Sequence, residues 1–199
     1  MKQMLLETIR IENGKIHNLS YHQQRFDRSQ KACFGSTHPI KLSDKIIPPA
    51  KGLFRCRILY SDTIEQIAYL PYVPKTIQHI HIVSSNLDYS HKWAERSPFA
   101  EMLAMHPGAD EILIEKEGLL TDTTIANIAF YDGLKWLTPE KPLLHGTMRQ
   151  KLLDEGFLQT ASLKKEDLDN YTHVALMNAM IGFKIYNLKD LTILKTPLK

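Results

Sequence analysis

Two prolines only three residues apart, in Pro71-Tyr-Val-Pro74, constrain the fold of this chain more than any other feature. Proline has no amide N–H and fixes its own φ, so a pair this close favours neither a helix nor a central strand. We therefore expect a domain junction here, with a small α+β domain at residues 1–74 and a larger, strand-rich domain at residues 75–199. A chain of 199 residues is long enough for both.

The first domain is predicted to consist of a hairpin, a helix and a second hairpin. Residues 4–11 alternate loosely as a strand, and Asn13-Gly14 is the dipeptide that best fits a tight turn. Ser20-Tyr-His-Gln23 is similar to a capping box and predicts a helix to about Phe34, ending at Gly35. A short helix and two strands are expected next, at residues 41–47, 54–61 and 64–70.

The second domain is predicted to be mostly short strands. Ser97-Pro98 indicates the start of a helix to about Met105, and Thr147 is a candidate N-cap for a helix through Leu153, with Gly156 just past its end. Strands are expected at residues 77–83, 111–115, 125–131, 135–138, 172–178 and 183–187. The whole pattern predicts an α+β protein.

Composition and charge exclude several classes of protein. No apolar run approaches the roughly 20 residues that cross a bilayer, and Glu7 and Arg10 interrupt any signal peptide, so we expect a cytoplasmic location. Cys33 and Cys56 are expected to be reduced thiols. The net charge of +3 is modest and the basic residues are interleaved with acids, so nucleic acid is not an expected partner.

Two residues of the predicted second domain could carry chemistry. Lys92 lies between aromatic residues, and partial burial there could make its neutral amine a nucleophile or base, although most lysines are solvated surface residues. Asp122 could hold a protonated ring nitrogen, with the hydroxyls of Thr121, Thr123 and Thr124 around it. The alternative for Asp122 is a turn-forming residue that bonds nearby backbone amides.

Two further features suit an anion. In residues 143–153, a glycine and a threonine lead into a helix whose N-terminal amides could hold a phosphate, although many helices start this way and bind nothing. Arg25 lies one turn after His22 in the first helix; it could clamp a phosphate, or simply face water. An amine, an acid, a phosphate seat and an arginine are together what a pyridoxal phosphate enzyme needs. No metal is expected, because His79 and His81 lack an obvious third ligand.

The sequences of two stretches support this inference further. Residues 111–153, which include TDTTIANIAFY and LLHGTMRQKLL, resemble the core of the class IV aminotransferases, the fold-type IV group of branched-chain and D-amino acid aminotransferases and aminodeoxychorismate lyase. Upstream, ETIRIENGKIHNLSYHQQRF resembles the Glu-Thr hairpin and His-x-x-Arg helix of that family. The resemblance covers nearly the whole chain, and it implies a pyridoxal 5'-phosphate enzyme that forms a homodimer.

The resemblance implies a role for each matching position. Lys92 would form the Schiff base, Asp122 would pair with the pyridine nitrogen, and Arg25 would hold the phosphate. The other cofactor-binding positions implied are Thr123, Thr124, Leu144, Gly146, Thr147, Met148, Asn178 and Ala179. The chain departs from the family in having Asp rather than Glu at 122 and in reading Gly-Thr-Met-Arg at the phosphate turn. It also begins almost at the hairpin, and a missing strand there could change the substrate pocket, the dimer contact or both.

The resemblance leaves the reaction open between three alternatives. Lys92-x-x-x-Arg96 and the Gly-x-Met-Arg turn at residues 146–149 are similar to aminodeoxychorismate lyases, which act in folate biosynthesis and release pyruvate to give 4-aminobenzoate. An aminotransferase for small amino acids is the close alternative. A catalytically silent relic that binds a phosphorylated ligand is the third. In the first two cases the substrate is a small molecule with amino and carboxylate groups.

Overall fold

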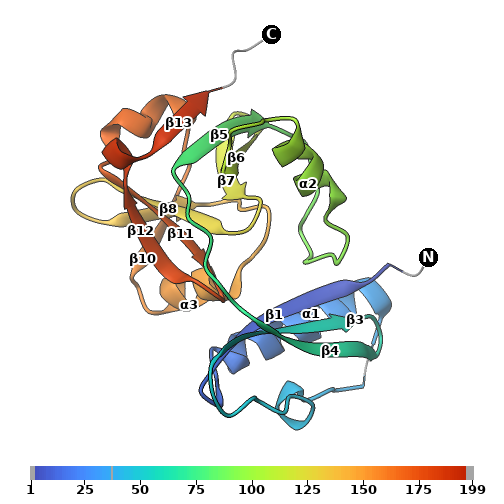
Figure 1. The fold of residues 1–199 in the computed structure, drawn as a ribbon. Coiled ribbons are helices and arrows are strands. Elements are labelled where there is room, and N and C mark those ends of the chain that lie inside the picture. Colours follow the sequence, from blue (N-terminus) through green and yellow to red (C-terminus); the bar gives the residue numbers. More distant parts are fainter. Residues whose placement is uncertain (1–2, 37, 196–199) are drawn as a thin grey trace. The chain divides into compact units, whose positions relative to one another are not determined.

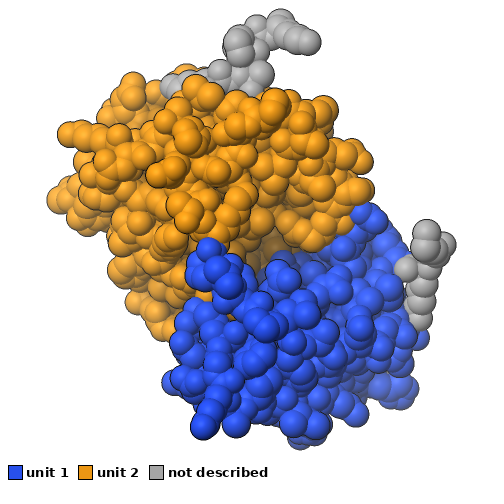
Figure 2. Space-filling model, viewed as in Figure 1, with its two compact units in different colours: residues 1–74, 91–95 blue, residues 75–90, 96–199 orange. Residues whose placement is uncertain are grey.

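The computed structural model describes residues 3–36 and 38–195, and its backbone contacts divide the chain into two compact units. Unit 1 comprises residues 1–74 and 91–95, and unit 2 comprises residues 75–90 and 96–199 (Figure 2). Both units contain helices and strands, which confirms the predicted α+β class. The segment with Lys92 therefore groups with unit 1, whereas the predicted division of the domains at residue 74 stays a prediction.

Unit 1 is an antiparallel sheet with one helix against a face of it (Figure 1). Its strands follow the order β2-β1-β3-β4. Asn13 and Gly14 have φ values of 48° and 80°, so the tight hairpin turn is confirmed. The elements are β1 (Leu5–Glu12), β2 (Lys15–Ile16), α1 (Leu19–Phe34), a 3₁₀ turn (Leu42–Asp44), β3 (Leu53–Tyr60) and β4 (Ile64–Pro71).

The core of unit 1 lies on one face of its sheet. Alternate residues of β1 point to the same face of a strand, and Leu5, Glu7, Ile9 and Ile11 are all completely buried. From β3, Cys56 packs in the same core, and burial raises the pKa of its thiol to about 12. Glu7 is therefore an acid in an otherwise apolar row, and it needs a charged partner from another element.

Two local predictions in unit 1 are wrong. The capping box is absent: α1 begins at Leu19, its N-cap is Asn18 in the left-handed region with φ 52°, and Ser20 is already helical. The helix expected at residues 41–47 is only a 3₁₀ turn of three residues. A residue before proline is biased away from helical geometry, so Pro48 stops any extension of this turn.

Unit 2 is built on a nine-stranded mixed sheet. Its main order is β10-β9-β8-β7-β6-β5-β13, and β11 pairs with β8 and β12. The strands are β5 (His79–Ser84), β6 (Glu111–Lys116), β7 (Leu119–Thr123), β8 (Asn127–Tyr131), β9 (Trp136–Pro139), β10 (Leu158–Ala161), β11 (His173–Asn178), β12 (Gly182–Asn187) and β13 (Thr192–Lys195). The helices are α2 (Ser97–Ala104) and α3 (Thr147–Asp154), with 3₁₀ turns at Lys165–Asn170 and Leu188–Asp190.

The polar stretch TDTT is itself the end of a strand. The sequence predicts one strand at residues 125–131, whereas β8 begins at Asn127 and β7 occupies Leu119–Thr123. A tight turn between the two strands places Asp122 opposite Asn127 in the ladder. Strands β10 and β13 were also missed. Within the described residues, no helix has the length and apolarity needed to cross a membrane.

Candidate active site

Asp122 lies at the centre of a hydrogen-bonded network in unit 2. Its side chain is buried, with 4% of the residue exposed. Asn127 Nδ2 donates to Asp122 Oδ1 over 2.8 Å, and the backbone N–H of Leu144 donates to Asp122 Oδ2 over 2.8 Å. The Asp122 carboxylate thus accepts hydrogen bonds from β8 and from the loop before α3. A simple turn former would instead accept them from the amides of the residues that follow it.

Burial dominates the protonation of Asp122. Removal from water raises the pKa of its carboxyl to about 7, against the hydrogen bonds from Asn127 and Leu144 and the charge of Arg149, which lower it. The acid therefore exchanges its proton near neutral pH. A carboxyl of this kind can donate a hydrogen bond to a ring nitrogen or accept one from its protonated form.

The three threonines do not surround Asp122 as expected. Thr121 Oγ1 donates to the Ile114 carbonyl over 2.9 Å. Thr123 Oγ1 accepts from the amide of Ala126 over 3.1 Å and so closes the turn between β7 and β8. The predicted hydroxyl bonds to Asp122 are therefore wrong. In their place Asn127, which the sequence analysis did not single out, is the side-chain donor.

Thr124 is engaged with a buried acid on β6. Its N–H donates to Glu111 Oε1 over 3.0 Å, and its hydroxyl donates to the same oxygen. Burial raises the pKa of the Glu111 carboxyl, and these bonds lower it in part. Thr123 and Thr124 thus fix the backbone of the turn beside Asp122.

The loop before α3 leads directly into the N-terminus of that helix. The first hydrogen bond of α3 runs from the Gln150 amide to the Gly146 carbonyl over 2.9 Å, which makes Gly146 the N-cap and Thr147 the first helical residue. The prediction that Thr147 is the N-cap is therefore wrong by one position. The amides of the first turn face the N-terminal end, where the helix dipole is positive. Met148 follows within that turn.

Arg149, in the first turn of α3, links this helix to β9. Its Nη2 donates to the Pro139 carbonyl over 2.7 Å, and its Nε donates to Thr138 Oγ1 over 3.2 Å. Burial lowers the pKa of the Arg149 guanidinium, and the charge of Asp122 raises it. The arginine of the Gly-x-x-Arg sequence thus supports the strand β9 and the start of α3.

The turn after β11, which contains Asn178 and Ala179, also reaches this part of unit 2. Asn178 Nδ2 donates to the Ile125 carbonyl over 3.1 Å, and Asn178 Oδ1 accepts from the amide of Met180 over 2.8 Å. The turn that contains Asn178 and Ala179 is therefore held against the β7–β8 turn. Hydrogen bonds join Asp122 to Asn127 and Leu144, and Asn178 holds the turn that follows Asp122; a shared role of these residues toward a cofactor stays a prediction.

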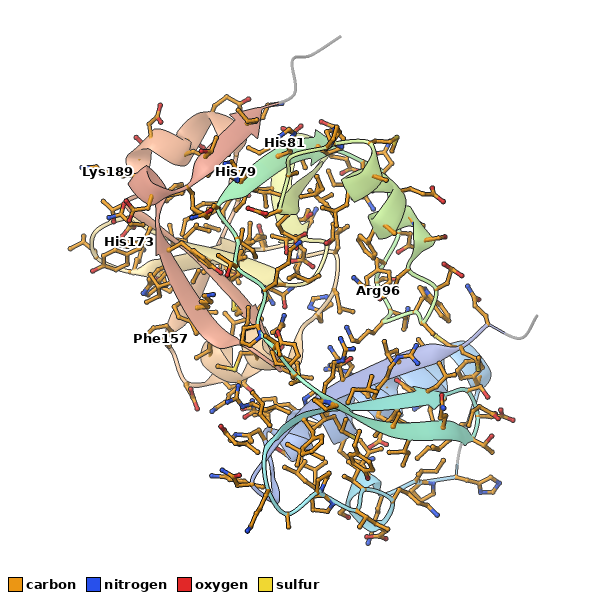
Figure 3. The ribbon with its side chains drawn as sticks, viewed as in Figure 1. His79, His81, Arg96, Phe157, His173 and Lys189 are labelled. Carbon is orange, nitrogen blue, oxygen red and sulfur yellow. The ribbon has the colours of Figure 1, made fainter. Side chains whose placement is uncertain are left out.

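Arg96 joins the same turn from the start of α2 (Figure 3). Its Nη2 donates to the Thr124 carbonyl over 2.5 Å, and its Nη1 donates to the Tyr89 hydroxyl over 3.1 Å. The guanidinium also lies over the ring of Phe99, 4.8 Å from the centroid. Arg96 therefore ties residues on both sides of the Lys92 segment to the turn after Asp122.

Unit 1 contains a buried cluster of Glu7, His22 and Arg25. Arg25 donates through Nε and Nη2 to the two carboxylate oxygens of Glu7, over 2.7 and 2.6 Å, and His22 Nδ1 lies 2.7 Å from Glu7 Oε2. Burial raises the pKa of Glu7, but Arg25 and His22 outweigh it and hold the pKa at about 2. Arg25 is thus buried and ion-paired rather than exposed, and its role toward a phosphate stays a prediction.

The segment with Lys92 runs along the edge of β1. Leu6 N donates to the Lys92 carbonyl and Ala94 N donates to the Met4 carbonyl, both over 2.8 Å, and Trp93 forms a bridge with Leu5. Burial lowers the pKa of His22, and the charge of Lys92 adds to this effect, so the amine belongs to the electrostatic surroundings of the buried cluster. Within unit 1, the charges of Lys92 and Arg25 both act on His22.

Neutralising Glu7 should destabilise the fold strongly. We expect Glu7→Gln to lower the free energy of unfolding by about 3–5 kcal/mol, because it leaves the buried Arg25 charge without its carboxylate. The stability that Glu7 contributes is present above its unfolded pKa of 4.5 and is lost as the pH falls toward 2. Urea unfolding between pH 3 and 7 measures both effects.

A surface pair on the same strand is the matched control. Glu12 pairs with Arg10 over 2.9 Å, but 40% of the Glu12 side chain is exposed. We expect Glu12→Gln to change the free energy of unfolding by less than about 1 kcal/mol. Equal effects of the two substitutions would show that the buried cluster is not a special source of stability.

No group of three or more His, Cys, Asp or Glu side chains that could hold a metal occurs within residues 3–36 and 38–195. His79 is instead bonded to Asp110, with 3.3 Å between Nδ1 and Oδ2. The ring of His81 packs edge-on against His106. Both histidines lie on β5 (Figure 3).

Comparison with known proteins identifies the family. The family model for amino-transferase class IV matches residues 4–184. A Haemophilus influenzae protein described as "Uncharacterized protein" is 38% identical over 184 residues, which are 89% of this chain and 98% of that protein. A Schizosaccharomyces pombe "Putative aminodeoxychorismate lyase" is 37% identical over 75 residues, covering 35% of this chain and 32% of that one.

A solved structure shares both sequence and fold. The Haemophilus somnus protein described as a "putative 4-amino-4-deoxychorismate lyase" is 35% identical, with a TM-score of 0.84, and the match covers 92% of this chain and 98% of that one. The resemblance drawn from the sequence and the predicted fold-type IV architecture are thereby confirmed. This chain belongs to the class IV aminotransferase family, which consists of pyridoxal phosphate-dependent enzymes.

Proposed function

We propose that the protein is a pyridoxal phosphate enzyme that converts 4-amino-4-deoxychorismate into 4-aminobenzoate and pyruvate. The observation that carries the cofactor assignment at this site is the buried Asp122 carboxyl, held between Asn127 and the loop that starts α3. The choice of a lyase is supported by the 35% identity to the Haemophilus somnus protein over nearly the whole chain.

The residues of unit 2 fit the two ends of this cofactor. A carboxyl with a pKa of about 7 suits a pyridine nitrogen, because the pair can share one proton in either direction. The first turn of α3 offers backbone amides and a positive dipole end, which suit a phosphate. An acid near a ring nitrogen and amides near a phosphate are complementary to one molecule of pyridoxal phosphate.

Each residue then has a role derived from its chemistry. Lys92 would hold the cofactor through its amine, and the free amine would take the proton from the carbon that bears the substrate amino group. Asp122 would hold a proton at the ring nitrogen of the cofactor. Arg25 and the amides of the Gly146-Thr147-Met148 turn bind the phosphate. Further binding or shaping contacts are proposed for Thr123, Thr124, Leu144, Asn178 and Ala179.

When bound, pyridoxal phosphate supplies the carbonyl that takes up the substrate amine and an electron sink for the pair released at the adjacent carbon. Asp122 stabilises charge that develops only as that proton leaves, which is where electrostatic stabilisation accelerates a reaction. The proton taken up by Lys92 is balanced by the proton that the departing enolpyruvate group gains when it becomes pyruvate. The substrate becomes aromatic without an oxidant or a second substrate.

We also propose the setting in which this enzyme works. It would act in the cytoplasm, in folate biosynthesis, on a small substrate with amino and carboxylate groups. It would be a homodimer in which each chain has the domains 1–74 and 75–199. The outermost strand β12 pairs only with β11 among the described strands, and its Ile185 is 52% exposed, which supports a contact with another chain. Light scattering should give twice the chain mass of 22.9 kDa.

The reaction is tested by supplying its substrates separately. Protein loaded with pyridoxal phosphate is incubated with 4-amino-4-deoxychorismate, and 4-aminobenzoate and pyruvate are quantified by chromatography and a coupled assay. A parallel reaction contains branched-chain or D-amino acids with 2-oxoglutarate. We expect equal amounts of 4-aminobenzoate and pyruvate in the first reaction and no keto acid exchange in the second.

Two other outcomes would replace the proposal. Transamination without 4-aminobenzoate would assign the protein as an aminotransferase for small amino acids. A protein that shows no absorbance of bound pyridoxal phosphate and no turnover would be a ligand-binding relic.

A further inference from the structure

Asn127 bonds both Asp122 and the loop before α3, although the sequence analysis did not single it out. One hydrogen of its Nδ2 group is donated to Asp122 Oδ1, and the other is donated to the Leu144 carbonyl, each over 2.8 Å. Leu144 in turn donates its N–H to Asp122 Oδ2 over 2.8 Å. Three hydrogen bonds thus form a closed ring that joins β7, β8 and the loop before α3.

The ring leaves little freedom to the carboxylate. The two oxygens of Asp122 accept hydrogen bonds from Asn127 on β8 and from the backbone of the loop before α3, so rotation of the carboxyl would break at least one of them. Leu144 uses both its N–H and its carbonyl in the same ring. With 6% of Asn127 and 4% of Asp122 exposed, water cannot readily replace these bonds.

Gly146, in the loop before α3, lies directly against the side chain of Asn127. All the other glycines of the chain have positive φ, which explains them by backbone conformation. Gly146 has φ −70° and ψ 144°, which any residue can adopt. A β-carbon added at Gly146 would lie 1.9 Å from Asn127 Oδ1 and 3.1 Å from its Cγ. Position 146 is therefore a glycine because the amide of Asn127 occupies the space of a side chain.

We propose that Asn127 is a positioning residue that locks Asp122 and the loop 144–146 into one rigid support, and that Gly146 is required so that this amide can lie against the loop. The inference rests on the proposed function, because the support is useful only if Asp122 and the start of α3 bind the same molecule. A shift of the loop then moves the acid, and a change at the acid moves the loop. The ring nitrogen and the phosphate are thereby held at a fixed separation.

A double-mutant cycle in the cofactor-free protein tests the contact directly. Gly146→Ala should lower the urea midpoint strongly, because its new methyl group overlaps Asn127 Oδ1. Asn127→Ala should lower the midpoint by losing the hydrogen bonds. In the double variant the methyl group fills the space that the amide vacates, so we expect it to be no less stable than Asn127→Ala alone. Additive losses would overturn the contact.

Titration of Asp122 separates positioning from simple stability. The ¹³C shift of the Asp122 carboxyl, followed by NMR in the cofactor-free protein, reports its pKa. Asn127→Ala should raise that pKa by about one pH unit, the size expected when a charged acceptor loses a hydrogen bond. Asn127→Asp, which keeps the shape but places a second acid beside Asp122, should raise it further. An unchanged pKa in both variants would contradict the proposal.

A matched control removes a different buried hydrogen bond on the same strand. Thr121→Val keeps the shape of the side chain and deletes its bond to the Ile114 carbonyl. We expect this variant to lose stability while the pKa of Asp122 stays unchanged. An equal pKa change in Thr121→Val would reduce Asn127 to a structural residue.

Binding of pyridoxal phosphate completes the test. Asn127→Ala and Gly146→Ala should each weaken binding by at least about tenfold, because either change disrupts the contact that holds Asp122 and the loop 144–146 together. If wild-type protein does not bind pyridoxal phosphate, the proposed function fails, whereas the urea and NMR measurements on the cofactor-free protein still decide the role of Asn127. If wild type binds and the two variants bind equally well, the positioning role is wrong.

Discussion

Replacing Lys92 with alanine is expected to reduce turnover by at least about 10³-fold, because the substitution removes both the amine that holds the cofactor and the base that takes the substrate proton. The absorbance of bound pyridoxal phosphate should also be lost. Borohydride treatment of the wild-type protein should attach the cofactor irreversibly to one peptide, and mass spectrometry should place it on Lys92.

The effect should be local to the amine. The backbone of residues 92–94 is held to β1 by its own hydrogen bonds, so the variant should keep the far-UV spectrum and most of the urea midpoint of the wild type. Lys45→Ala, at an exposed lysine of unit 1, is the control and should retain turnover and absorbance. Wild-type turnover in Lys92→Ala, or a borohydride adduct on another lysine, would remove Lys92 from the mechanism.

Replacing Asp122 with asparagine should lower activity and should also remove a pH dependence from the free energy of unfolding. The amide cannot balance a protonated ring nitrogen, so we expect kcat to fall by about 10²–10³-fold, the usual cost of losing one preorganised electrostatic group. Some binding of pyridoxal phosphate should remain, because Arg25 and the start of α3 are unchanged. Steady-state kinetics with saturating cofactor separates the two quantities.

The pH dependence follows from the raised pKa of Asp122. In the unfolded chain the carboxyl ionises near pH 3.8, whereas in the folded protein without cofactor it ionises near pH 7. Between these values the unfolded state has lost a proton that the folded state keeps, so the free energy of unfolding falls as the pH rises from about 4 to about 7. The raised pKa of Asp122 can lower the free energy of unfolding by at most about 4 kcal/mol over this pH range.

The Asp122→Asn variant should lack this fall. Glu111 also has a raised pKa and contributes in the same direction, whereas the lowered pKa of His22 contributes in the opposite direction, so the difference between the two proteins isolates Asp122. Urea unfolding of cofactor-free protein at pH 4, 5.5, 7 and 8 measures it. Parallel curves for the two proteins would mean that Asp122 is ionised throughout, and its proposed proton exchange with the cofactor would then be wrong.

The elements that the sequence predicts well are those whose signals are local. The hairpin at Asn13-Gly14, the helix that ends at Gly35 and the helix at Ser97-Pro98 each depend on turn or capping residues within a few positions. Strands β10 and β13 have only four residues each, and each is defined by parallel pairing with an earlier strand, β9 or β5, that is not joined to it by a hairpin. No local pattern contains that information.

The site divides in the same way. Lys92, Asp122 and Gly146 stand out in the sequence because their residue types suggest chemistry. Asn127 did not stand out, because its two partners are 5 and 17 residues away and are brought together only by the sheet and the loop. Glu7 likewise meets Arg25 across 18 residues. A polar residue at the buried start of an apolar strand, or within a row of core residues, was the available signal for both.

The parallel pairing of β13 with β5 has a consequence for synthesis on the ribosome. Residues 79–82 of β5 pair with residues 192–195, so more than a hundred residues must be made between the two partners. Until the later strand emerges, one edge of β5 lacks this neighbour, and an uncovered edge is a place where nascent chains associate. The four-stranded sheet of unit 1 needs only residues 5–71 and can assemble much earlier in translation.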